Sequence, residues 1–160
     1  MAKKTAQPEL SLDDIRLSIA RYCSKMERCK SDVMKKLSSL PLSAEEKASI
    51  VQYLENEGYI DEKRFAKAFA SDKLRFDGWG KLKIKYSLLK KGIGETLIDE
   101  TLNELDEDVY VQKLTEELVK KLKTLPTNLD PYTRYMKLFQ FGFQRGFESD
   151  LVDKVIRELR

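Results

Sequence analysis

A run of basic residues in the middle of the chain is the feature whose residue types could do chemistry. Residues 73–91 hold seven lysines and arginines and a single acid, whereas residues 92–108 hold seven acids and no base. A cationic segment of this kind attracts phosphate groups regardless of base sequence, or an acidic protein surface. The candidate binding residues are Lys73, Arg75, Trp79, Lys81, Lys83, Lys85, Lys90 and Lys91.

These residues also have a purely structural interpretation. Lysines on a helix often form a solvated face, with their stems lying along apolar seams. Trp79 lies between two glycines, where it could stack on an exposed base or pack at the start of a helix. We favour packing for Trp79 and leave both interpretations of the lysines open. Base-specific recognition is not expected, because the run has no cluster of Arg or Asn pairs.

Little in the sequence points to an enzyme or a metal protein. There is no histidine, the commonest general acid–base residue. The spacings typical of serine hydrolases, phosphate-binding loops and zinc proteases are also absent. Cys23 and Cys29 cannot complete a four-ligand zinc site without carboxylates, so we expect two reduced thiols packed near a helix face. We predict a non-enzymatic protein without cofactor or metal.

Length and composition limit the class of protein. The chain has 160 residues, of which 41% are hydrophobic and 36% charged, with a net charge of +3. This is enough apolar material for a core. No apolar run approaches the ~20 residues that span a membrane, and the first ten residues lack the apolar part of a signal peptide. We expect a cytoplasmic protein without membrane attachment, whose residues 1–10 form a flexible tail.

Helical periodicity runs through the rest of the chain. Ser31 and Ser43 are predicted N-caps, and Glu46 completes a capping box with Ser43. Asp61 is predicted to begin a helix with an aromatic stripe in the core, made of Phe65, Ala68, Phe69 and Phe76.

The helix predicted after Gly80 carries apolar residues on two opposite sides. One side holds Leu82, Tyr86 and Leu89, and the other holds Ile84 and Leu88. This pattern predicts a helix clamped between two neighbours, with lysines along both seams. The acids of residues 95–108 are expected to solvate the following helix, close to these lysines.

A pattern repeats three times along the chain. In each copy a residue that breaks a helix is followed by an apolar residue, and aliphatic residues come at matching positions further on. The three pairs of break residue and apolar residue are Pro41 and Leu42, Gly92 and Ile93, and Gly146 and Phe147. Self-similarity of this kind indicates stacked supersecondary units. We predict an all-α fold, an elongated right-angled array of three tandem three-helix repeats at residues 11–58, 59–106 and 107–160.

Two central motifs resemble the RecX family, bacterial regulators of the RecA recombinase. The motif EGYIDEKRFAKAF matches the family at Gly58, Tyr59, Ile60, Asp61, Phe65 and Ala66. The motif GWGKLKIKYSLLKKGI matches it at Gly80, Ile84, Leu88, Lys91, Gly92 and Ile93. The resemblance covers about residues 12–160. Two departures are Glu62, where the family often has a second aspartate, and YCSKMERC, where a more arginine-rich stretch is expected.

The resemblance implies a modular regulator that binds RecA filaments and has no reaction of its own, and we expect the chain to be a monomer. It implies inhibition of recombinase, ATPase and co-protease activity, and hence an effect on DNA repair, homologous recombination and the SOS response. Weak, non-specific DNA contact is also implied. The alternative is a helical DNA-binding or architectural protein that acts through phosphate contacts without RecA.

Overall fold

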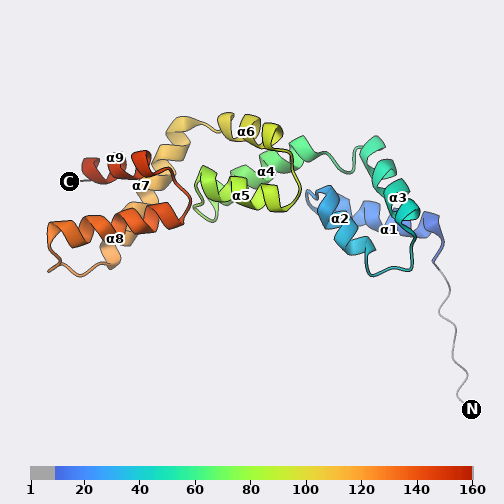
Figure 1. Cartoon of the computed structure of the whole chain (residues 1–160), viewed down its shortest axis with the longest axis horizontal. Helices are drawn as coiled ribbons and strands as arrows, with labels where there is room; N and C mark the ends of the chain where they lie inside the picture. The colour runs from blue at the N-terminus through green and yellow to red at the C-terminus, as the bar shows by residue number, and fades with distance from the viewer. Residues whose placement is uncertain (1–9, 160) are drawn as a thin grey trace, which may run out of the picture. The chain divides into compact units, whose positions relative to one another are not determined.

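The computed structural model describes residues 10–159, so the predicted tail lies outside the described residues except for Leu10. This part of the chain folds as nine helices with no strand (Figure 1). The helices are α1 (Leu12–Lys25), α2 (Lys30–Leu37), α3 (Ala44–Asn56), α4 (Glu62–Arg75), α5 (Lys81–Lys90), α6 (Glu95–Asn103), α7 (Glu107–Thr124), α8 (Pro131–Gln144) and α9 (Ser149–Glu158). The all-α prediction is confirmed. Within residues 10–159, none of these helices has the length and apolar character needed to cross a membrane.

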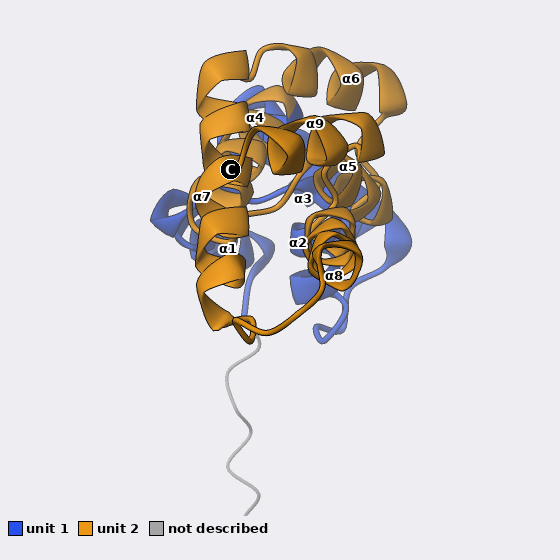
Figure 2. Ribbon diagram, turned by 90° about the vertical axis from the view of Figure 1, so that its left-hand side faces the viewer, with its two compact units in different colours: residues 1–62 blue, residues 63–160 orange. Residues whose placement is uncertain are grey.

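The chain divides into two compact units, residues 1–62 and residues 63–160 (Figure 2). The first holds α1, α2 and α3, and the second holds nearly all of α4 together with α5 to α9. The finer division into repeats at 11–58, 59–106 and 107–160 stays a prediction.

The first unit has a small apolar core between its three helices. Its buried residues are Ile15, Ile19, Ala20, Cys23, Val33, Leu37, Ile50, Leu54 and Ile60. The capping box predicted for α3 is confirmed: the Glu46 N–H donates to Ser43 Oγ over 3.0 Å, and the Ser43 N–H donates to Glu46 Oε1 over 3.1 Å.

The predicted cap of α2 is wrong by two residues. Cys29, not Ser31, is the N-cap, and its N–H donates to Asp32 Oδ2 over 3.2 Å. Cysteine is a poor capping residue by type. Here its burial decides the register, because the Cys29 side chain is fully inside the unit. Ser31 then falls within the first turn, with its hydroxyl 3.1 Å from Cys29 Sγ.

The second unit has a core that runs through all of its helices. The two corner residues Ile93 and Phe147 are buried, as the repeat pattern predicts. Each follows a glycine in the left-handed region, Gly92 with φ 81° and Gly146 with φ 91°, where other residues are strained. The glycine lets one helix stop, and the apolar residue then packs under the corner.

Two predictions about packing in this unit are wrong. Phe76 is not part of the aromatic stripe: it follows the end of α4 and is 74% exposed. In α5, Ile84 and Leu88 are buried, but the residues of the opposite side are exposed. That side consists of Leu82, Tyr86 and Leu89, which are 51%, 60% and 44% exposed. The helix is therefore covered on one side only.

Candidate functional site

The basic run extends from the end of α4, through a turn, along α5. Lys73 and Arg75 lie in the last turn of α4, Trp79 lies in the turn, and Lys91 is the C-cap of α5. The remaining members, Lys81, Lys83, Lys85 and Lys90, lie on α5 itself. The structure thus places all eight candidates on α4, α5, the turn between them and the C-cap of α5, within one compact unit.

Trp79 packs against the helices around it through two cations and one ring. The Nζ atoms of Lys73 and Lys83 lie 4.7 and 4.6 Å from the centre of its ring. The Phe69 ring meets it edge-on, with 6.5 Å between centroids. Contacts of this type contribute about 0.5–2 kcal/mol each, depending on how far the cation is desolvated. They hold the two lysines at the junction of α4 and α5.

Lys81 and Lys85 form ion pairs with the acids that follow α5. Lys85 Nζ lies 2.9 Å from Asp99 Oδ1 and 3.1 Å from Glu95 Oε1. Its hydrogen bonds to Asp99 and then to Glu95 raise the pKa of Lys85. Lys81 Nζ lies 3.5 Å from Glu107 Oε2. The expectation that the acid run lies close to the lysines is therefore confirmed for these two residues, whose charges are largely neutralised within the unit.

Lys83 and Lys90 lie on the other flank of α5 and differ from this pair. Neither has an ion-pair partner anywhere in the described stretch from residue 10 to residue 159. Lys83 contacts the Trp79 ring, and Lys90 Nζ lies 4.7 Å from the centre of the Tyr86 ring. The three exposed apolar residues of α5 lie between the two lysine flanks. We call Leu82, Lys83, Tyr86, Leu89 and Lys90 the α5 surface.

The other two basic candidates lie outside the α5 surface. The Arg75 guanidinium lies 5.5 Å from the Phe76 ring centre, on the exposed end of α4. Lys91 lies on the opposite side of α5, with Nζ 5.7 Å from the Phe65 ring and 6.0 Å from the Phe69 ring. Lys73, besides its contact with Trp79, forms an ion pair with Asp77, with 2.9 Å from Nζ to Oδ2. The basic run therefore contains cations paired with acids, cations packed on rings and the two lysines of the α5 surface.

The position of α5 depends on Tyr110, a residue that the sequence analysis missed. Its ring is fully buried, 5.1 Å from the Phe147 ring. Its hydroxyl accepts the Lys81 N–H over 2.9 Å and donates to Glu148 Oε1. Burial, followed by the bond to Glu148, raises the pKa of Tyr110 well above its usual value. The periodicity of Leu114 and Leu118 extends back to Tyr110, and this is the signal that could have identified it.

The α5 surface offers groups that can bind an acidic or apolar partner. They are two ammonium ions, a phenol and two aliphatic side chains. Among the residues that the structure describes, no group of three His, Cys, Asp or Glu side chains could hold a metal ion.

Comparisons with known proteins agree on one family. Residues 61–102 match the model of the second three-helix domain of RecX, and residues 108–156 match that of the third. The regulatory protein RecX of Chlorobium phaeobacteroides is 30% identical over 139 residues, which cover 87% of this chain and 89% of that protein.

Other relatives are longer than this chain. The RecX of Clostridium tetani is 31% identical over 140 residues, and that of Clostridium botulinum strain Eklund 17B is 31% identical over 109 residues. The matched parts span 64% and 50% of those two proteins. In fold, the chain is similar to the crystal structure of RecX from Lactobacillus salivarius, with a TM-score of 0.82, 24% identity and coverage of 92% of this chain and 96% of that one.

Proposed function

Because this chain belongs to the RecX family of regulatory proteins, we propose that it regulates RecA by binding RecA filaments. In this proposal it inhibits the recombinase, ATPase and co-protease activities of the filament and has no reaction of its own. It acts as a cytoplasmic monomer, and its effect is on homologous recombination, DNA repair and the SOS response.

The observation that carries this proposal is the composition of the α5 surface. A row of exposed apolar side chains is bordered on one flank by Lys83 and Lys90, which lack an acidic partner among residues 10–159. Protein interfaces typically have an apolar centre with aromatic residues and a polar rim. The exposed Leu82 and Leu89 have no use in a phosphate contact, so they favour a protein partner with acidic groups around an apolar patch.

The second candidate is direct DNA binding without RecA, and Lys83 and Lys90 are the observation that favours it. A lysine without an acidic neighbour can neutralise a phosphate and release a counterion. The two candidates differ in what they require of the leucines. A protein interface needs both the leucines and the lysines, whereas phosphate binding needs the lysines alone.

Two double variants test this difference in RecA-dependent ATP hydrolysis on single-stranded DNA. We expect Leu82→Ser/Leu89→Ser and Lys83→Glu/Lys90→Glu each to raise the concentration for half-inhibition about thirtyfold, because two interface residues that cost ~1 kcal/mol each together cost ~2 kcal/mol. The leucine variant should leave direct DNA binding, measured by fluorescence anisotropy, unchanged.

The matched control is Lys137→Glu, which reverses an exposed cation on α8 and should inhibit like the unmodified chain. If the lysine variant inhibits normally at moderate salt, these lysines are only a solvated face. If only the lysine variant fails, and its DNA binding falls in parallel, phosphate contact replaces the protein interface as the explanation.

A further inference from the structure

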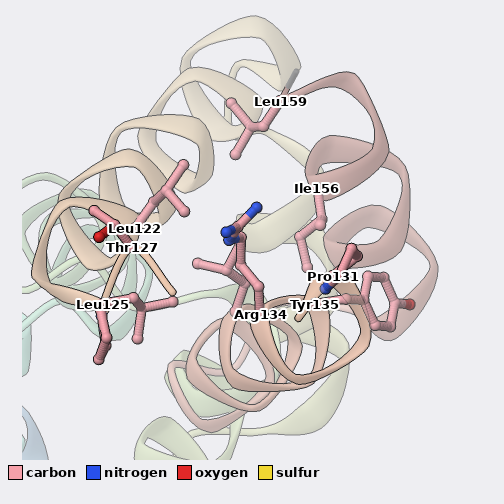
Figure 3. Close-up of a pocket in the computed structure, with 10 residues that line it drawn as sticks. Leu122, Leu125, Thr127, Pro131, Arg134, Tyr135, Ile156 and Leu159 are labelled. Atoms are coloured by element: carbon pink, nitrogen blue, oxygen red, sulfur yellow. The ribbon is translucent and has the colours of Figure 1, made fainter. Parts of the chain in front are cut away.

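A cavity of about 550 Å³ lies in the second unit, away from the α5 surface (Figure 3). It is formed by the C-terminal ends of α7 and α9 and by the N-terminal end of α8. Most of its wall is apolar, contributed by leucine, isoleucine and proline side chains such as Leu122, Ile156 and Leu159. Its volume falls in the range of about 300–1,000 Å³ that is typical of ligand pockets.

One charged group, Arg134, enters this apolar cavity. Figure 3 shows its guanidinium between Leu122 and Ile156, with its nitrogen atoms directed toward Leu159. Its Nη2 donates to the Leu129 carbonyl oxygen over 3.2 Å. Within residues 10–159 it has no ion-pair partner. A guanidinium has five N–H donors in a planar fork, so most of them remain available to a group in the cavity.

The acids Asp130, before α8, and Asp153, on α9, each have hydrogen-bond partners. The Asp130 carboxylate caps α8 by accepting the Thr133 N–H over 3.2 Å. The Asp153 carboxylate accepts hydrogen bonds from the Tyr135 hydroxyl and from Arg157 Nε. Arg134 is half-buried and makes no ion pair within residues 10–159, although its charge helps to lower the pKa of Asp130 at the start of α8. Its free N–H donors can therefore take a carboxylate that enters the cavity.

We propose that this cavity docks a short peptide segment of a partner protein, in which a bulky apolar side chain adjoins a carboxylate. The apolar wall takes the side chain, and the Arg134 fork takes the carboxylate in a bidentate pair. Thr127 is an exposed residue that lines the cavity, and its hydroxyl can hydrogen-bond to the peptide backbone. The site is separate from the α5 surface and does not depend on the identity of the partner proposed above.

The test is a methyl NMR titration of the full chain with two matched probes. They are N-acetyl-phenylalanyl-aspartate and N-acetyl-phenylalanyl-asparagine, each with an amidated C-terminus. The two probes differ only in whether the second side chain ends in a carboxylate or in an amide. We expect the aspartate probe to shift the methyl signals of Leu122, Ile156 and Leu159. It should bind about tenfold more tightly than the asparagine probe, as expected for a hydrogen bond to a charged group.

Variants assign this preference to Arg134. Arg134→Leu should abolish the preference for the aspartate probe. If this variant fails to fold, Arg134→Gln, which keeps a donor for the Leu129 carbonyl, replaces it and should also abolish the preference. Lys137→Leu removes a cation from the same helix and should keep the preference. The proposal is overturned if both probes bind with equal affinity, if neither probe shifts a signal, or if the shifts are confined to other methyl groups. It is also overturned if Lys137→Leu abolishes the preference as Arg134→Leu does. Octanoate serves as a third probe. If octanoate binds and neither peptide does, the cavity binds a fatty acid and the peptide proposal is overturned.

Discussion

At the scale of single residues, Tyr110 shows how one buried polar group positions a surface. The Tyr110 hydroxyl joins the first turn of α5 to the turn before α9, through Lys81 and Glu148. Because the ring is fully buried, neither hydrogen bond can be replaced by bulk water without opening the unit. The start of α5 is thereby held against α7.

We expect Tyr110→Phe to lower the free energy of unfolding by about 1–3 kcal/mol, the usual cost of leaving buried partners unsatisfied. Urea denaturation measures this change. The control is Tyr132→Phe, since Tyr132 is 71% exposed and its loss should cost little. An equal and small effect of both substitutions would show that the Tyr110 hydroxyl does not hold α5.

Some residue roles could be predicted from sequence and others could not. The pairing of Lys85 with the acid run follows from their opposite charges and short separation along the chain. The partners of Tyr110 could not be found in this way, because Glu148 lies 38 residues away and the pair is formed only by packing. The position of Trp79 between two glycines favours packing, and the structure shows it in contact with neighbouring side chains. Its two lysine neighbours could not be predicted, because they come from different helices.

At the scale of elements, two glycines allow α5 to pack against the turn between α8 and α9. The Gly80 N–H donates to the Arg145 carbonyl oxygen over 2.7 Å, and the Leu82 N–H donates to the Gly146 carbonyl oxygen over 3.0 Å. A Cβ on Gly80 would lie 2.4 Å from the Gly146 backbone. The backbones approach so closely that no side chain fits between them.

We expect Gly80→Ala to destabilise the second unit by about 1–3 kcal/mol or more, because the backbone must move to relieve the overlap. Gly94→Ala is the matched control: Gly94 also precedes a helix, has negative φ, and a Cβ there meets nothing within 4 Å. Thermal unfolding of the two variants gives the comparison. Equal melting temperatures would mean that this contact is not a tight constraint.

Helices were predictable from sequence because their signals are local. Apolar spacing, the Ser43 box and the glycines at helix ends all act within a few residues. The errors arose where tertiary burial overrides local type, as at Cys29, which caps α2 although Ser31 is the better capping residue. The apolar residues on two sides of α5 predict a neighbour on each side, but only one side is buried. Periodicity shows which residues share a side and does not show whether another element covers it.

At the scale of the whole molecule, the sequence carried the family and the all-α fold but not the surface that we propose for binding. The central motifs lie at buried positions and corners, such as Ile84, Leu88, Gly92 and Ile93. Such residues specify a fold, and they say little about the partner. The α5 surface became apparent only once burial divided the basic run into paired and unpaired lysines.

The proposed regulation of RecA is tested most directly by a titration of ATP hydrolysis at fixed RecA and two concentrations of single-stranded DNA, both in excess. We expect the amount of chain that gives half-inhibition to follow the amount of RecA filament. It should lie far below the amount needed to cover the DNA, and it should not change when the free DNA is doubled. If half-inhibition instead requires saturation of the DNA and doubles with it, the chain competes for DNA and does not act on the filament.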